Sequence, residues 1–128
     1  MSENPSDYMD LADEALDDLG KMIESEVSVR PLYSRLYYAV FYSAKAGLLS
    51  RGVEAKTHRG TASQAYQILF DEKGLISKEE AMVLQSLQEK RDMADYELEI
   101  NFDMEDFNED YSRSENFIRR MKEIIGKE

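Results

Sequence analysis

Proline occupies only two of the 128 positions, Pro5 and Pro31, and each stands where a helix can begin. Elsewhere apolar side chains recur at helical spacing, with loops of roughly three to seven residues between the long segments. Short loops between long helices favour antiparallel neighbours. We predict an all-α fold, a four-helix up-and-down bundle with a short additional helix, as a single domain over residues 1–128. The predicted helices span about 6–26, 31–50, 58–70, 78–97 and 104–125.

Local capping signals set several helix ends. Thr57 is a plausible N-cap for the third helix, and Ser77 with Glu80 has the S-x-x-E spacing of a capping box. Asp103 can cap the last helix, and Gly126 ends it.

The helix over residues 31–50 is apolar or aromatic almost all round. One stripe follows Leu36, Tyr37 and Val40, and a second follows Tyr38 and Phe41. A helix with two apolar sides must lie at the centre of the fold, or must contact a second chain as well as its own core.

The net charge of −11 weighs against a broad surface for nucleic acid, and we expect no DNA binding. The charge is unevenly distributed, however. Residues 28–70 carry six basic side chains and one acidic side chain, whereas residues 1–27 and 71–110 are strongly acidic. Charged blocks are common on helical surfaces. The alternative is that the basic segment faces an anion or the acidic surface of a partner.

The chain has no cysteine and one histidine. This composition excludes a disulfide framework, thiolate catalysis and a multi-histidine metal site within one chain, so we expect no metal and no cofactor. The first ten residues are polar, and no apolar run approaches the roughly 20 residues that span a bilayer. We therefore expect a cytoplasmic protein that does not bind membranes.

Arg91 interrupts the apolar stripe of the fourth predicted helix, between Leu87 and Ala94. A guanidinium on a buried face needs a partner or a cleft. Asp95, one turn later, can pair with it, and Asp92 flanks it. Arg91 is then either part of a structural ion pair or an arginine held for phosphate, because its fork matches two phosphate oxygens.

Three further residues are candidates for the same site. His58 opens a predicted helix beside Arg59, and basic neighbours at a helix N-terminus favour an anion such as phosphate. A solvated histidine is the alternative. Tyr96 follows Arg91 by five residues, about 140° around the helix. It would border the same groove only if that groove is wide or shared with a second chain.

Together, these residues resemble the HEPN domain family, in its small stand-alone prokaryotic branch often encoded beside a minimal nucleotidyltransferase. The resemblance lies in RLYYAVFYSAKAGLLSRGVEAKTHRG, AYQILFDEKGLIS and KRDMADYE, over roughly residues 35–97. It implies a helical bundle, usually a homodimer. Many members are metal-independent ribonucleases, and several are toxins of toxin–antitoxin pairs.

The signature of the family ribonucleases is an arginine followed four to six residues later by a histidine. Arg91 matches the arginine and Asp92 its polar neighbour, but Tyr96 stands where the histidine would be at the shortest spacing. Tyrosine is a poor base at pH 7. His58 could replace the missing histidine only if the fold brings it close. The tyrosine that partner enzymes modify in some relatives corresponds to Leu98, so that modification does not carry over.

We therefore expect a protein that binds a nucleotide or RNA phosphate through Arg91 and works with a nucleotidyltransferase. Asp92 and Asp95 would orient the arginine, and Tyr96 would shape the site or donate a hydrogen bond to it. Two alternatives stay open. One is a metal-independent ribonuclease toxin, with Arg91 and Tyr96 as tentative catalytic residues. The other is a non-catalytic dimeric interaction module.

Overall fold

The structure, a computed structural model, describes residues 4–25, 28–96 and 103–126. Every regular element in these three ranges is helical, which confirms the predicted all-α class. The segment η1 is a π-helical continuation of α3. The elements are α1 (Pro5–Glu24), α2 (Val29–Leu49), α3 (His58–Gln64), η1 (Ala65–Glu72), α4 (Lys78–Ala81), α5 (Val83–Tyr96) and α6 (Met104–Ile125).

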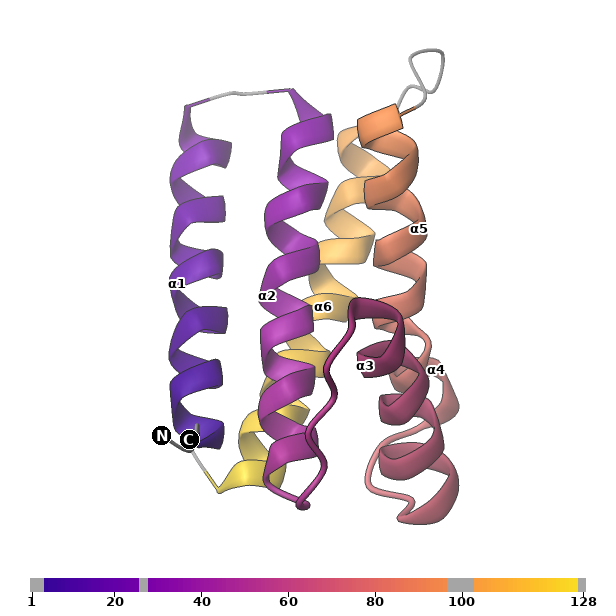
Figure 1. Ribbon diagram of the computed structural model, residues 1–128. Helices are drawn as coiled ribbons and strands as arrows, with labels where there is room; N and C mark the ends of the chain where they lie inside the picture. The colour runs from indigo at the N-terminus through magenta and orange to yellow at the C-terminus, as the bar shows by residue number, and fades with distance from the viewer. Residues whose placement is uncertain (1–3, 26–27, 97–102, 127–128) are drawn as a thin grey trace.

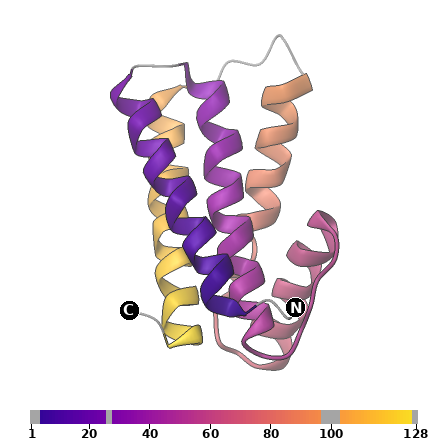
Figure 2. The ribbon, with the colours of Figure 1, turned by 60° about the vertical axis from the view of Figure 1, so that its left-hand side comes forward.

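The four long helices α1, α2, α5 and α6 run side by side with alternating direction, as the up-and-down bundle predicts (Figure 1). The start of α1 and the end of α6 lie at the same end of the bundle (Figure 2). The helix α2 is central, because it packs against α1, α5 and α6 and also against α3. The chain after α2 climbs back along the bundle, so α3 begins beside α2 and α5 (Figure 1).

The predicted capping signals are present. The Thr57 hydroxyl accepts a hydrogen bond from the Gly60 amide at 2.8 Å. Ser77 and Glu80 form the full capping box, with bonds of 2.8 and 3.0 Å. Gly126 ends α6 in the left-handed conformation, with φ of 77°. Local capping residues therefore fix these helix ends.

Two boundaries differ from the prediction. The third helix is α-helical only to Gln64 and continues as the π-helical η1 to Glu72, and the fourth is divided at Met82 into α4 and α5. The Met82 amide is shared between the carbonyls of Lys78 and Glu79, at 3.1 and 3.2 Å, which tightens the chain locally. The predicted helix ends at residues 26 and 97 lie outside the described residues.

The core is built on α2, whose largest fully buried side chains are Tyr33 and Tyr37. From α6, Phe107 and Phe117 pack into the same core, and Met9 and Leu19 of α1 cover the other side. Among the described helices, none has the length and apolar character to cross a bilayer.

A buried carboxylate joins three helices. The Asp110 side chain on α6, which is 6% exposed, receives the Lys90 ammonium of α5 at 2.5 Å. The Tyr33 hydroxyl of α2 donates to the same oxygen at 2.7 Å, and Arg113 reaches the other oxygen at 3.3 Å. Burial and the neighbouring carboxylate raise the pKa of Tyr33 well above its ordinary value, so the phenol stays a donor.

Candidate functional site

The single histidine of the chain is fixed by α2. Because Thr57 caps α3, His58 is the first helical residue, beside the aromatic face of α2. Its ring stacks on Phe41 with centroids 4.2 Å apart and planes 9° from parallel. The Tyr37 hydroxyl lies 2.6 Å from Nδ1 of His58, in a hydrogen bond. His58 is therefore an oriented, half-buried group rather than a freely solvated one.

Arg91 of α5 also contacts the Tyr37 ring, and with it the ring of Tyr38. Its guanidinium carbon lies 4.6 Å from the centre of the Tyr37 ring and 5.8 Å from that of Tyr38. One terminal nitrogen donates to the Tyr38 hydroxyl at 3.4 Å, and the other to Asp92 at 3.3 Å. Both bonds are long, and the buried Nε has no hydrogen-bond partner within the described residues. Much of the hydrogen-bond donor capacity of the Arg91 guanidinium is therefore unused.

We call Tyr37, Tyr38, His58 and Arg91 the tyrosine cluster. Burial, with the nearby positive charges of Arg91 and Lys45, lowers the pKa of His58 below its ordinary value. Burial raises the pKa of Tyr37 to about 12, although Arg91 acts in the opposite direction. At neutral pH the cluster therefore holds a neutral imidazole, a protonated phenol and a cationic guanidinium.

This arrangement leaves Nε2 of His58 without a hydrogen bond to any described residue. When Tyr37 donates to Nδ1, the ring proton lies on Nε2, which can donate to a phosphate oxygen. In the other tautomer Nε2 is an acceptor, the form that a general base requires. Beside the charged fork of Arg91, either form has a chemical use with a phosphate ligand.

The fold places the other predicted site residues in different surroundings. Arg59 and Asp92 face one groove of about 700 Å³ between α3, η1, α4 and α5. Asp95 and Tyr96 are exposed, Tyr96 to 81%, and neither side chain forms a hydrogen bond or ion pair with that of Arg91 in the part of the chain described. The predicted pairing of Asp95 with Arg91 is therefore corrected, because the guanidinium lies over the α2 rings and reaches Asp92 instead. Leu98 lies outside the described residues.

Sequence reasoning missed Tyr37 and Tyr38 as the groups that hold Arg91. Their signal in the sequence was only the richness of α2 in tyrosine, which also fits a core or an interface. The contacts join residues more than 20 positions apart, so no local pattern encodes them.

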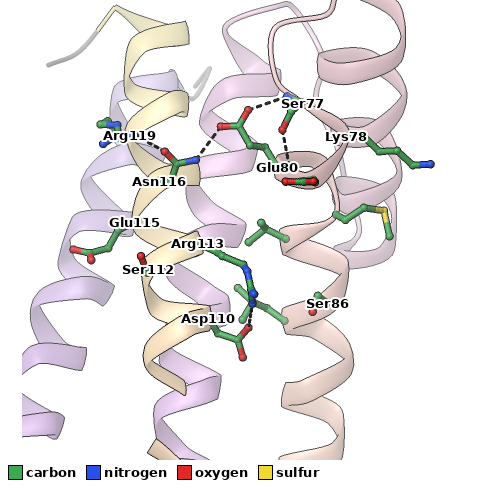
Figure 3. Close-up of a pocket in the computed structure, with 14 residues that line it drawn as sticks. Ser77, Lys78, Glu80, Ser86, Asp110, Ser112, Arg113, Glu115, Asn116 and Arg119 are labelled. Atoms are coloured by element: carbon green, nitrogen blue, oxygen red, sulfur yellow. Dashed lines mark hydrogen bonds and ion pairs between the residues drawn. The ribbon is translucent and has the colours of Figure 1, made fainter. Parts of the chain in front are cut away.

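A larger groove, of about 1370 Å³, lies between α4, α5 and α6 (Figure 3). Four of its charged side chains, those of Glu80, Asp110, Arg113 and Arg119, already have partners. Arg113 pairs with Asp110, and Arg119 donates to Asn116, which in turn donates to Glu80. This groove contains none of the tyrosine cluster, and its Asn116–Glu80 hydrogen bond joins α6 to α4. We therefore take the cluster, and not the larger groove, as the candidate site.

The lowered pKa of His58 predicts a pH-dependent loss of stability. Because the folded protein binds this proton less readily than the unfolded chain, the stabilisation is complete above about pH 6.5 and falls as pH drops toward the folded-state pKa. Thermal unfolding of the native protein and of His58→Gln between pH 7.5 and 5 measures this loss of stability. We expect a steeper fall in midpoint for the native protein. Parallel curves would contradict the assignment.

Comparison with known proteins agrees with this fold. The HEPN domain family matches over residues 6–125. A UPF0332 protein of Thermotoga maritima is 28% identical over 114 residues, covering 89% of this chain and 85% of that protein. A UPF0332 protein of Gloeobacter violaceus is 36% identical over 63 residues, covering 49% of each chain. Because the family match takes in nearly the whole bundle, the chain belongs to the HEPN domain family.

Proposed function

We propose that this chain is a cytoplasmic, homodimeric protein that binds the phosphate of a nucleotide or RNA and acts with a nucleotidyltransferase partner. The observation that carries the proposal is the state of Arg91. Its side chain is 20% exposed and held on two tyrosine rings, its two hydrogen bonds are long, and its buried Nε is unpaired within the described residues.

A phosphate group suits this environment. A guanidinium presents a planar fork to two phosphate oxygens, and the tyrosines hold that of Arg91 with two ring contacts and a single long hydrogen bond, from one terminal nitrogen to the Tyr38 hydroxyl. Nε2 of His58 supplies a further contact from α3. The local balance of charge also favours an anion, because residues 28–70 carry six basic side chains and one acidic one.

The partner follows from the branch of the family that the sequence resembles, in which a minimal nucleotidyltransferase accompanies the HEPN chain, in some cases as a toxin–antitoxin pair. The acidic segments 1–27 and 71–110 offer complementary charge to a basic partner surface.

A thermal-shift series with nucleotides and short RNAs tests phosphate binding. A ligand at 100 times its Kd stabilises the folded state by about 2.7 kcal/mol, which raises the midpoint by several degrees. We expect this rise for a phosphate-bearing ligand and none for the matching nucleoside. No shift with any ligand at millimolar concentration would contradict the proposal and favour the non-catalytic interaction module.

A second candidate, a metal-independent ribonuclease, is favoured by one specific observation. His58 and Arg91 contact the same ring of Tyr37, although His58 does not follow Arg91 in the sequence. A neutral imidazole beside a cationic guanidinium suits abstraction of a 2′-hydroxyl proton and stabilisation of a charged phosphorane. Tyr96 is not needed for this chemistry.

The ribonuclease candidate makes its own prediction. Purified protein should cleave unstructured RNA in EDTA, and His58→Gln should reduce the rate roughly 100-fold or more. Tyr96→Phe, which changes an exposed side chain outside the cluster, should leave the rate unchanged. Cleavage that persists in His58→Gln would remove His58 from the reaction.

A further inference from the structure

An unbroken series of aromatic rings leads away from the tyrosine cluster along α2. The His58 ring lies 5.9 Å from that of Tyr38, the Tyr38 ring 6.0 Å from that of Tyr42, and the Tyr42 ring 6.4 Å from that of Tyr8 on α1. All four rings are half-buried, so each keeps part of its surface at the protein exterior. We call the series Tyr38–Tyr42–Tyr8 the ring path.

The rings of the ring path are held in place from beneath by packing against α2. Tyr38, Phe41, Tyr42 and Lys45 lie on one face of α2, at the i, i+3, i+4 and i+7 positions. Phe41 is buried and contacts both tyrosines, at 6.3 and 5.5 Å between ring centres. The rings are thus held by the core of the bundle and lose little freedom when a ligand lies on them.

A cation stands at each end of the path. At one end, the Arg91 guanidinium is 5.8 Å from the centre of the Tyr38 ring. At the other, the Lys45 ammonium is 4.7 Å from the centre of the Tyr8 ring and 5.7 Å from that of Phe41. Positive charge interleaved with aromatic faces is the chemistry that binds single-stranded nucleic acid.

We propose that the ring path is a base-stacking platform that extends the phosphate site along α2, with Lys45 as a second phosphate contact. This inference rests on the proposed function. It narrows the ligand class from any phosphate compound to a short single-stranded oligonucleotide, whose bases lie on Tyr38, Tyr42 and Tyr8 while its backbone spans from Arg91 to Lys45.

The test compares two short fluorescein-labelled RNAs of equal length and charge by fluorescence anisotropy. One carries its bases, and in the other abasic riboses replace those that would reach the platform. We expect the native protein to bind the base-bearing RNA at least about fivefold more tightly, because stacking on an aromatic side chain favours each base. Tyr42→Ala should remove that preference and leave the affinity for the abasic RNA unchanged.

Two variants serve as controls. Tyr111→Ala truncates a half-buried tyrosine on α6 that packs against Phe107, outside the path, and should keep the preference for bases. Lys45→Ala should weaken the binding of both RNAs and lower the slope of log Kd against log salt concentration by about one. Circular dichroism confirms that each variant is folded before binding is measured.

The outcomes separate the two proposals. Equal affinity for both RNAs, with loss of binding in Arg91→Ala, would overturn the platform and leave the phosphate site standing. No binding of either RNA would overturn the platform, and the phosphate site would fall with it only if nucleotides also fail to raise the thermal midpoint. If Tyr42→Ala leaves the preference intact but dissociates a dimer in sedimentation, the ring path is an interface between two copies of this chain, and the platform is wrong.

Discussion

Arg91→Ala is expected to abolish binding of nucleotide or RNA phosphate while the bundle remains folded. Charge-assisted hydrogen bonds contribute roughly 1.5–3 kcal/mol each, so loss of the fork should weaken binding about 30-fold or more. The expected cost to folding is small, about 1 kcal/mol, because the side chain contributes mainly a cation–π contact on Tyr37. Isothermal titration calorimetry and thermal unfolding measure the two effects separately.

Two variants control for the loss of charge. Arg91→Lys keeps the charge but not the planar fork, and should bind with intermediate affinity. Arg119→Ala removes an exposed guanidinium from α6 that donates to Asn116, and this variant should bind the ligand like the native protein. Equal weakening in Arg91→Ala and Arg119→Ala would show a general effect of net charge and contradict a localised site.

Asp110→Ala is expected to cause the largest loss of stability, roughly 3 kcal/mol. Removing one partner of a buried ion pair leaves the other without compensation, and here Lys90 and Tyr33 both lose their acceptor. Urea denaturation at neutral pH measures the change in the free energy of unfolding. Asp110→Asn keeps the shape and one acceptor, so we expect a smaller loss.

Glu109→Ala is the matched control for this prediction. Glu109 stands next to Asp110 and pairs with Arg113 at 3.9 Å, but its side chain is 61% exposed. Exposed pairs contribute about 0–1 kcal/mol, so this variant should be nearly neutral. If Asp110→Ala is as mild as Glu109→Ala, the carboxylate does not join the three helices in the way described.

The helices could be predicted because their signals are local. Caps such as Thr57 and Ser77 act within one turn, and the apolar stripes repeat within each helix. The π-helical η1 and the break at Met82 were missed, since they depend on how the segment fits against its neighbours. No spacing rule in the sequence describes that fit.

The candidate site was only half predictable, for a related reason. Arg91 stood out because a charge interrupted an apolar stripe, and His58 because its neighbours were basic. Their shared contact with Tyr37 comes from the packing of α2, α3 and α5, which no local pattern encodes. The same rule, a charge that interrupts an apolar stripe, could have identified Asp110, because Asp110 lies three residues after Phe107 on the apolar face of α6.

The central claim is that Arg91 and His58 form one phosphate site, and the NMR signal of His58 tests it most directly. The chain has one histidine, so its imidazole resonances are unambiguous. Titration with a nucleotide monophosphate should shift them saturably and raise the pKa of His58, since a bound anion favours the charged ring. In Arg91→Ala the same concentrations should leave them unmoved. Resonances that stay fixed in the native protein while the ligand raises its thermal midpoint would place the bound phosphate elsewhere and contradict the claim.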